Sequence, residues 1–374
     1  MHYPDLSKLA LSMLLGLGLS TSALAAKEIT VAPGVPPSHE AFAPYAKFAT
    51  LLPEVTKGDY KTRELGMEVV NLSNALEALK SYMIDVAQVL SLYTPAEFPN
   101  TVFISELAAL GSDGHVMGAA TTEYMLECAE CMAEFKRLGL VYTGSLATQP
   151  YYILSTKPVR TKADLEGLRL RSGGSPFSRW ATELGAVPVQ MSTTEQYEAI
   201  SNGLLDGTLN PPAALIGARL GEVVKYVTPM PIGTFQAAMG FVLRRDVWQG
   251  MTPEQRAAFV KAATIASAEY APSNAALGER GIEEGKARGL EVVVPAEDLI
   301  EANRTFAQSD MATVAEIGRS RYRVKEPEAK IQRYQELVAK WTELLAGKGN
   351  DSDQIGEIIY DELWSGRDLS KFGN

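Results

Sequence analysis

Short apolar runs and longer stretches with helical spacing of apolar residues alternate along most of this chain. Four runs bounded by polar or turn residues predict strands: 27–31, 66–70, 85–91 and 140–146. The stretches between and around them predict helices: 40–52, 74–83 and 122–138. In 74–83, for example, Leu76, Leu79 and Met83 fall at helical spacing. Strands that alternate with helices indicate an α/β fold built from βαβ units.

The stretch 167–211 predicts a compact succession of strand, turn, helix, short strand and helix. Leu168 and Leu170 alternate with Arg169 and Arg171, which is the period-two pattern of a strand with one apolar face. A pair of glycines ends this strand, and a serine and a proline then begin a helix. Arg171 is therefore expected at the end of a strand, facing a helix N-terminus. Open α/β sheets bind anionic ligands at such places.

The rest of the chain continues this pattern and becomes largely helical toward its end. The further predicted elements are a helix beginning at Ser192, a helix at 213–225, a strand at 239–243, a helix from 252 to 286, a strand at 290–294 and helical structure at 297–345. The clearest helix start is Thr252, because Gln255 three residues later completes a capping box. Pro272 predicts a break or kink within that helix.

The length and composition of the chain allow two domains and limit its partners. It has 374 residues, of which 46% are hydrophobic and 21% charged, as in ordinary globular proteins. The formal net charge of −10 gives no electrostatic support for binding nucleic acid or an anionic membrane surface. An anionic ligand would therefore need a local positive site that acts against the overall field.

The first 26 residues have the pattern of a secretory signal peptide. Lys8 precedes a leucine-rich apolar run at 9–19, and Ala23-Leu24-Ala25 provides a small-x-small cleavage site. The run is too short to favour a membrane span, and an amphipathic N-terminal helix is the alternative. We therefore expect the mature protein to work outside the cytoplasm.

The two cysteines of the chain, Cys128 and Cys131, lie on the predicted helix 122–138. In an oxidising compartment a local disulfide is the favoured interpretation. A redox-active Cys-x-x-Cys pair is an alternative, although no thioredoxin-like context surrounds it. A zinc site is the third interpretation, and the mature chain would offer it only His39 and His115 as histidine ligands.

Residue patterns that support catalysis are few. The sequence has no Gly-x-Ser-x-Gly, Gly-x-x-x-x-Gly-Lys or His-Glu-x-x-His motif. Two histidines in the mature chain leave few general bases near neutral pH. We therefore expect no enzymatic activity, no cofactor and no metal.

Two segments resemble the solute-binding proteins of tripartite ATP-independent periplasmic (TRAP) transporters, of the dicarboxylate-binding type. They are Gly167-Leu-Arg-Leu-Arg171 and Asp206-Gly-Thr-Leu-Asn-Pro211, and the resemblance extends more loosely from about 27 to about 347. It implies a two-domain periplasmic-binding-protein (Venus flytrap) fold, with the ligand cleft between the domains and a long helix spanning both. The expected parts are 1–26 as signal peptide, 27–150 with about 237–270 as domain I, 151–236 with about 287–346 as domain II, about 253–286 as connecting helix, and 347–374 as a tail without assignment.

The resemblance also implies how the ligand is held. A strand arginine of the family clamps the ligand carboxylate, and here it is Arg171, whose planar guanidinium can form two parallel hydrogen bonds to a carboxylate. From the residues alone, Arg171 would be an ordinary ion-paired strand arginine. Asn210 is expected to contact the ligand, the alternative being a turn residue before two prolines. Four further residues stand where relatives line the cleft: Ser91, Tyr93, Thr193 and Phe235.

Tyr151 departs from the pattern of the relatives that bind sialic acid, where a second ligand arginine stands at the aligned position. A tyrosine there removes one positive charge and leaves a flat surface with a single hydroxyl. A ligand with one carboxylate and an apolar or aromatic body would fit this change better than a dianion.

Together these features predict an extracytoplasmic solute receptor in the periplasm. It would bind an organic acid through a carboxylate–arginine clamp and deliver it to the membrane subunits of a TRAP transporter, which an ion gradient drives. The alternatives are a ligand-binding sensor partner of a signalling system and a periplasmic carboxylate-processing enzyme. The protein is expected to be a monomer or a homodimer.

Overall fold

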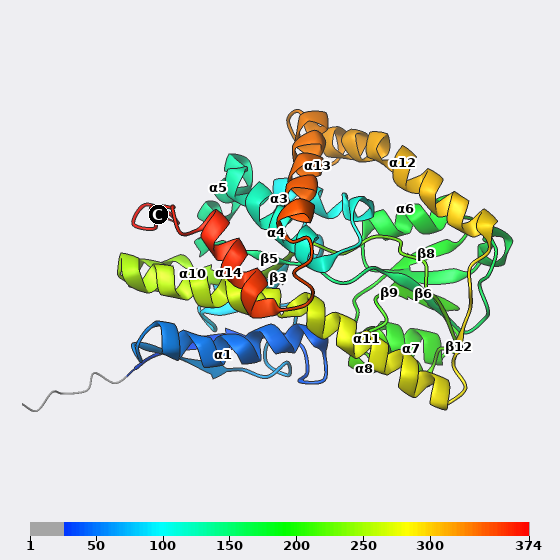
Figure 1. Ribbon diagram of the computed structural model, residues 1–374, viewed down its shortest axis with the longest axis horizontal. Helices are drawn as coiled ribbons and strands as arrows, with labels where there is room; N and C mark the ends of the chain where they lie inside the picture. Colours follow the sequence, from blue (N-terminus) through cyan, green and yellow to red (C-terminus); the bar gives the residue numbers. More distant parts are fainter. Residues whose placement is uncertain (1–25, 374) are drawn as a thin grey trace, which may run out of the picture.

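A computed structural model describes residues 26–373 of this protein (Figure 1). Within them the strands form two six-stranded sheets, each with helices packed against it. This arrangement agrees with the two-domain α/β fold that the sequence indicates. The predicted signal peptide lies outside the described residues.

The first sheet combines parallel strands with one longer antiparallel strand. Its order is β2-β1-β3-β11-β4, and β5 also pairs with β11. The strands are β1 (Lys27–Ala32), β2 (Tyr60–Glu64), β3 (Val86–Leu90), β4 (Leu140–Val141), β5 (Ser145–Leu146) and β11 (Ala238–Arg244). β1 is parallel to β2 and β3, whereas β11 is antiparallel to β3, β4 and β5. The central strand β3 is buried along its whole length, as its mostly apolar sequence predicts.

Helices from distant parts of the chain cover the first sheet. α10 (Pro253–Ala268) packs against both α1 (Ala43–Val55) and α14 (Ser352–Leu363). α4 (Gly114–Glu127) packs against α13 (Pro327–Leu344). The last two helices therefore belong to the layers around the first sheet, whereas the sequence analysis placed residues up to 346 with domain II and left the tail unassigned.

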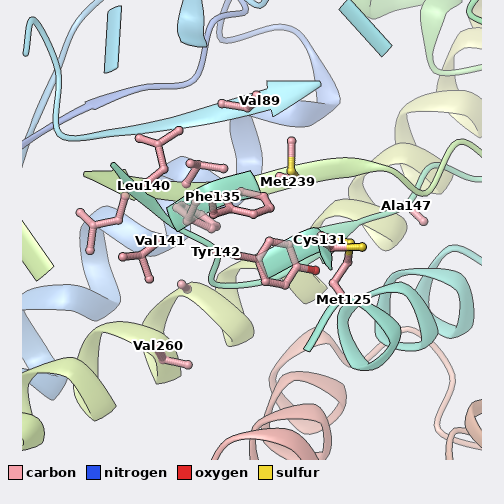
Figure 2. Packing of buried hydrophobic residues seen from close by; sticks show 14 of the residues in the cluster. Val89, Met125, Cys131, Phe135, Leu140, Val141, Tyr142, Ala147, Met239 and Val260 are labelled. Carbon is pink, nitrogen blue, oxygen red and sulfur yellow. The ribbon is translucent and has the colours of Figure 1, made fainter. Parts of the chain in front are cut away.

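The main hydrophobic core lies between this sheet and its helices. Figure 2 shows part of it, where Phe135 and Tyr142 lie close to Met239 of β11. The rings of Phe135 and Tyr142 are 5.4 Å apart at a tilted angle, a favourable aromatic arrangement. Trp341 of α13 is fully buried in the same core. Its burial shows that α13 is an integral part of this domain.

The second sheet has the order β12-β10-β6-β9-β7-β8. Its strands are β6 (Tyr152–Ser155), β7 (Arg169–Ser172), β8 (Val187–Gln190), β9 (Gly207–Asn210), β10 (Tyr226–Thr228) and β12 (Glu291–Val292). β7 lies between β8 and β9 and is parallel to both. The associated helices are α6 (Ser175–Glu183), α7 (Gln196–Ser201) and α8 (Ala214–Gly217). The predicted succession of elements in 167–211 is confirmed, with α7 beginning four residues after Ser192.

Two extended segments cross side by side between the sheets, 147–151 and 229–237. They are hydrogen-bonded to each other, because Thr148 N–H donates to Phe235 O over 2.9 Å and Tyr151 N–H donates to Gly233 O over 2.8 Å. Helices provide further crossings: α11 (Tyr270–Ala287) continues from α10 and packs on α8, and α12 (Glu297–Ser320) runs along both domains (Figure 1).

The long connecting helix has a one-residue interruption at Glu269, between α10 and α11. Pro272 explains its position, since proline has no N–H to donate to the carbonyl four residues earlier, that of Ala268. His115 uses the freed acceptor instead: its Nε2 lies 3.1 Å from Ala268 O. The predicted start of α10 is confirmed, because Thr252 and Gln255 cap each other's backbone N–H groups.

Some predicted elements are wrong. The strand expected at 66–70 is instead β2, at 60–64, and 66–70 forms turns. β2 is an edge strand in which Tyr60 is the one buried residue, so its charged sequence lacked the apolar pattern of a strand. The helix at 213–225 is shortened to α8 and a 3₁₀ turn, and 297–345 is divided into α12 and α13.

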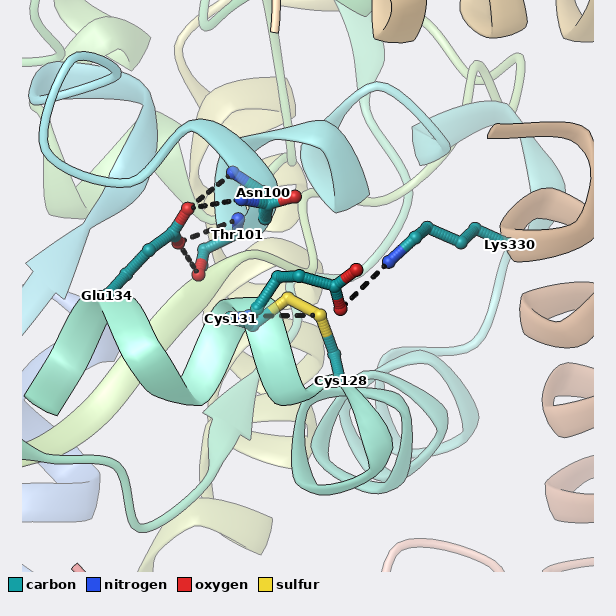
Figure 3. Close-up of a disulfide and its surroundings, with 7 residues drawn as sticks. Asn100, Thr101, Cys128, Cys131, Glu134 and Lys330 are labelled. Atoms are coloured by element: carbon teal, nitrogen blue, oxygen red, sulfur yellow. Dashed lines mark hydrogen bonds and ion pairs between the residues drawn. A yellow bond between two sulfur atoms is a disulfide. The ribbon is translucent and has the colours of Figure 1, made fainter. Parts of the chain in front are cut away.

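The predicted helix 122–138 is broken at Cys128, which separates α4 from α5 (Ala129–Leu138). Cys128 has an extended backbone and forms a disulfide with Cys131, so the expected disulfide is confirmed (Figure 3). One turn further along α5, the buried carboxylate of Glu134 accepts the backbone N–H groups of Asn100 and Thr101, 2.6 and 3.1 Å away. It thereby anchors α5 to the N-terminus of α3 (Pro99–Ser105).

Candidate functional site

A cavity of about 60 Å³ lies between the two sheets, several times the roughly 10–15 Å³ that one water molecule needs. The second sheet and its loops contribute five residues: Tyr151, Arg171, Gly173, Thr193 and Asn210. The first sheet and its loops contribute six: Leu72, Gln88, Leu90, Leu92, Tyr93 and Ala238. The remaining sides are closed by His39, Ala41, Thr148, Phe235 and Tyr270. The cavity is small and combines polar and apolar walls.

Arg171 is a buried cation without an acidic partner. It lies near the end of β7 and is 3% exposed. Its Nε donates to Met191 O over 3.2 Å, and among residues 26–373 no carboxylate forms an ion pair with it. Burying a charge is unfavourable unless it is paired and hydrogen-bonded. The site is therefore suited to an anionic group that enters from outside.

Arg169 provides the contrast on the same strand. Its side chain is 44% exposed and forms an ion pair with Asp206, with 2.9 Å between Nε and Oδ2. Hydrogen bonds from Arg169 hold the pKa of Asp206 well below its usual range. Arg169 thus has a structural role, and Arg171 is left for the cavity.

Tyr151 forms a flat wall beside Arg171. Its ring stacks on Phe177 of α6 with 4.0 Å between centroids and 6° between planes. Burial raises the pKa of Tyr151 to about 12, although the nearby Arg171 acts in the opposite direction, so its hydroxyl stays protonated. A Cβ atom at Gly173 would lie 3.2 Å from both Arg171 Nη1 and the Tyr151 hydroxyl. The glycine therefore leaves room for these two groups at the same point.

Asn210 is held by a network beneath the cavity. Its Nδ2 donates to Gln196 Oε1 over 2.7 Å and to Thr208 Oγ1 over 3.2 Å. Gln196 Nε2 in turn donates to Thr193 Oγ1 over 2.9 Å. Since the amide nitrogen of Asn210 is engaged, its oxygen is the atom left to contact a ligand.

The sequence of the chain matches that of a known family. Residues 32–316 match the bacterial extracellular solute-binding proteins of family 7, DctP. The chain belongs to this family. Its relatives include the C4-dicarboxylate-binding periplasmic protein DctP of Rhodobacter capsulatus, 31% identical over 115 residues, which are 30% of this chain and 34% of that protein. The 2,3-diketo-L-gulonate-binding periplasmic protein YiaO of Escherichia coli is 29% identical over 141 residues, 37% of this chain and 42% of that protein. The chain thus spans less than half the length of the curated relatives it matches.

Solved structures of TRAP solute-binding proteins share the fold of this family 7 protein. One from Bordetella bronchiseptica, with bound mandelate, superposes with a TM-score of 0.72 at 22% identity and covers 84% of this chain and 99% of its own. One from Rhodoferax ferrireducens, with copurified benzoate, reaches 0.74 at 17% identity and covers 86% and 100%. At these identities the likeness shows the fold, and it confirms the expected two-domain architecture.

Most residues that the resemblance assigned to the ligand lie around this one cavity: Arg171, Asn210, Tyr151, Thr193, Tyr93 and Phe235. Ser91 does not line it, although its neighbours Leu90, Leu92 and Tyr93 do. Its hydroxyl is fully buried and has no hydrogen-bond partner among residues 26–373.

Sequence reasoning missed four polar residues of the cavity: His39, Gln88, Thr148 and Tyr270. Gln88 had a signal, since it is a polar residue inside an otherwise apolar strand. Tyr270 lies on α11, next to the interruption of the connecting helix at Glu269. The sequence predicted this interruption three residues later, at Pro272.

No group of three or more histidine, cysteine or acidic side chains that could hold a metal occurs in the described part of the chain. Among the described helices, none is long and apolar enough to cross a membrane.

Proposed function

We propose that this protein is an extracytoplasmic receptor that binds an organic acid and delivers it to the membrane subunits of an ion-gradient-driven TRAP transporter. The observation that carries the proposal is the guanidinium of Arg171, buried in the cavity without an acidic partner among residues 26–373. A ligand carboxylate would offset the cost of burying this charge. The family supports the same role, because its members are bacterial extracellular solute-binding proteins.

The ligand that fits the cavity best has one carboxylate and a compact apolar body. Arg171 is the one arginine or lysine side chain among the residues that line the cavity. Leucines 72, 90 and 92, with Phe235, give apolar walls, and the stacked ring of Tyr151 gives a flat one. Aromatic acids are found in several structural relatives, including the mandelate and benzoate named above. A monocarboxylate with an aromatic ring is therefore the leading ligand class.

Ligand binding would favour the closed arrangement of the two domains. Arg171 belongs to the second sheet, whereas Gln88, Leu90 and Leu92 belong to the first or to the loop after it. A ligand that contacts both sides stabilises the closed form by its differential affinity for the two arrangements. The closed receptor would then dock on the transporter in the periplasm, after removal of residues 1–26. We infer no catalytic step, and nothing in the described cavity favours a signalling role.

The test is calorimetric titration of the mature protein with benzoate, benzamide and methyl benzoate. We expect only the free acid to bind, because the amide and the ester lack the charge that Arg171 pairs with. Arg171→Met should weaken binding of the acid on the order of a hundredfold, since it removes a buried charge-assisted pair.

The matched control is Arg169→Met, two residues earlier on the same strand. It should leave the affinity for the acid close to that of the wild type, because Arg169 pairs with Asp206 outside the cavity. Equal binding of acid and ester, or normal binding by Arg171→Met, would contradict the carboxylate clamp.

A further inference from the structure

Gln88 is a second polar group that the cavity buries without a partner. It lies in the middle of β3 and is 3% exposed. Its Oε1 is fully buried and accepts no hydrogen bond, and its Nε2 donates to no described residue. A buried amide with unmade hydrogen bonds is unfavourable, so a partner from outside the chain is expected there.

The direction of Gln88 follows from the strand. Side chains two residues apart share a face of a strand, and Gln88 and Leu90 of β3 both line the cavity. Gln236 makes a useful comparison, because its Oε1 is also unpartnered but its Nε2 donates to Ile104 O over 2.9 Å and it does not line the cavity. Gln88 is thus the unpaired amide that faces the ligand.

The charge around the cavity argues against a second acidic group on the ligand. Glu40 lies behind His39, with one carboxylate oxygen accepting from Asn274 Nδ2 over 3.2 Å and the other 3.3 Å from Nδ1 of His39. Burial raises the pKa of both Tyr151 and Tyr270, and the nearby carboxylate of Glu40 adds to each shift. This carboxylate therefore opposes further negative charge in the cavity, while Arg171 can satisfy a single carboxylate.

We propose that the ligand carries a hydroxyl group that Gln88 binds, so that the receptor selects compact hydroxylated monocarboxylates over both unsubstituted acids and dicarboxylates. The inference rests on the proposed function, because it takes Arg171 as the carboxylate site. A hydroxyl suits the amide, since it can donate to Oε1 and accept from Nε2. Polar pairing with a buried amide discriminates strongly against an analogue that lacks the hydroxyl, because the amide is then left unpaired.

The positions of Gln88 and Arg171 also couple the choice of ligand to closure of the two domains. Gln88 belongs to the first sheet and Arg171 to the second, so an acid with both groups bridges the two domains by polar contacts. An unsubstituted acid would be held by polar contacts on one side only.

The experiment compares dissociation constants for pairs of acids that differ by one hydroxyl: phenylacetate with (R)- and (S)-mandelate, and benzoate with 3- and 4-hydroxybenzoate. Succinate and isophthalate serve as dicarboxylates. For the wild-type protein we expect at least one hydroxylated acid to bind about tenfold or more tightly than its parent, and both dicarboxylates to bind more weakly. Gln88→Met keeps the size of the side chain and should bring the affinities for the hydroxylated acid and its parent to about the same value.

Binding of the parent acid by Gln88→Met shows that the variant is folded, and Gln88→Leu provides a second apolar replacement. An unchanged hydroxyl preference in both variants, or the absence of any preference in the wild type, would overturn this inference while leaving the carboxylate clamp in place. If the Arg171→Met variant still binds every acid as tightly as the wild type does, the proposed function is overturned instead.

Discussion

Two arginines of one strand show what a residue's sequence context can and cannot reveal. Arg169 and Arg171 share the polar face of β7, so the period-two pattern treats them alike. Their burial differs because Arg169 meets Asp206, whereas Arg171 enters the space between the domains. The period predicted the strand, and only the resemblance to a family singled out Arg171.

The other residues of the cavity were less accessible to sequence reasoning. Ser91 was expected at the cleft, but it begins a 3₁₀ turn, Ser91–Tyr93, in which Leu92 and Tyr93 line the cavity and Ser91 does not. Gln88 was missed because the run 85–91 was interpreted as a buried strand, in which a polar side chain has no evident partner. The role of Gln88 depends on the second sheet, which faces it across the cavity, and a local sequence pattern does not predict the position of that sheet.

Gly173 is predicted to be essential for affinity rather than for stability. Gly173→Ala would place a methyl group 3.2 Å from Arg171 Nη1 and from the Tyr151 hydroxyl, at the point where the ligand carboxylate is expected. We expect binding of benzoate to weaken about tenfold, which corresponds to a loss of about 1.4 kcal/mol of binding free energy. Gly366→Ala is the control, since a Cβ there meets no atom within 4 Å. Similar affinities for the two variants in calorimetry would contradict the crowding argument.

Asp206 gives a pH-dependent contribution to stability. Its pKa is lower in the folded protein than in the unfolded chain, so it stabilises the fold above the unfolded pKa of about 3.9, and this contribution is lost as the pH falls through the folded pKa. Asp206→Asn should lower the free energy of unfolding by about 2 kcal/mol at pH 7, because hydrogen bonds from Arg169 and Lys157 lose their charged acceptor. In urea denaturation the difference from the wild type should shrink between pH 5 and pH 3. A difference that stays constant over this range would count against the assignment.

At the scale of elements, signals contained within one turn were predicted best. The capping box of Thr252 and Gln255 depends only on residues within one helical turn, and the structure confirms it. The break near Pro272 occurs three residues earlier, at Glu269, because the missing N–H frees a carbonyl one turn before the proline. The strand predicted at 66–70 failed for a different reason: an edge strand is exposed and polar, so apolar patterning does not mark it.

The disulfide is predicted to stabilise the junction of α4 and α5 without affecting the ligand. It closes a loop of a few residues, so replacing both cysteines by serine should cost about 2 kcal/mol in free energy of unfolding. Neither cysteine lines the cavity, so the dissociation constant for benzoate should be unchanged. Denaturation and calorimetry on the same variant test both statements, and weakened binding would show that α4 and α5 are coupled to the cavity.

At the scale of the whole molecule, one partly buried arginine joins three parts of the fold. Arg179 of α6 donates from Nε and Nη2 to Asp310 of α12, over 2.7 Å each, and forms an ion pair with Glu106 beside the first sheet. Tyr322 also donates to Glu106, over 2.7 Å. The network therefore connects the second sheet, the first sheet and the helix that runs along both.

Arg179→Met is predicted to lower the free energy of unfolding by about 3–5 kcal/mol, because Glu106 and Asp310 would remain as buried carboxylates without their cation. Arg304→Met removes an exposed ion pair with Glu301 and should change stability by less than about 1 kcal/mol. Adding Glu106→Gln and Asp310→Asn to Arg179→Met should restore part of the loss. Equal effects of the two arginine substitutions in chemical denaturation would show that the network contributes little.

The arrangement of whole layers was the least predictable property of the chain. α13 and α14 were expected outside the first domain or left unassigned, yet both pack on its helices. Nothing in a periodic pattern states which distant helix will cover an apolar face, so sequence reasoning could define these helices but not their neighbours.

The paired crossing segments 147–151 and 229–237 have a mechanical consequence. A single linking segment would allow one domain to rotate freely relative to the other. Two segments joined by hydrogen bonds form a ribbon, which bends easily but resists twisting. If the domains of the proposed receptor move, we expect this pair of segments, together with α11 and α12, to restrict the motion mainly to opening and closing of the cavity between the sheets.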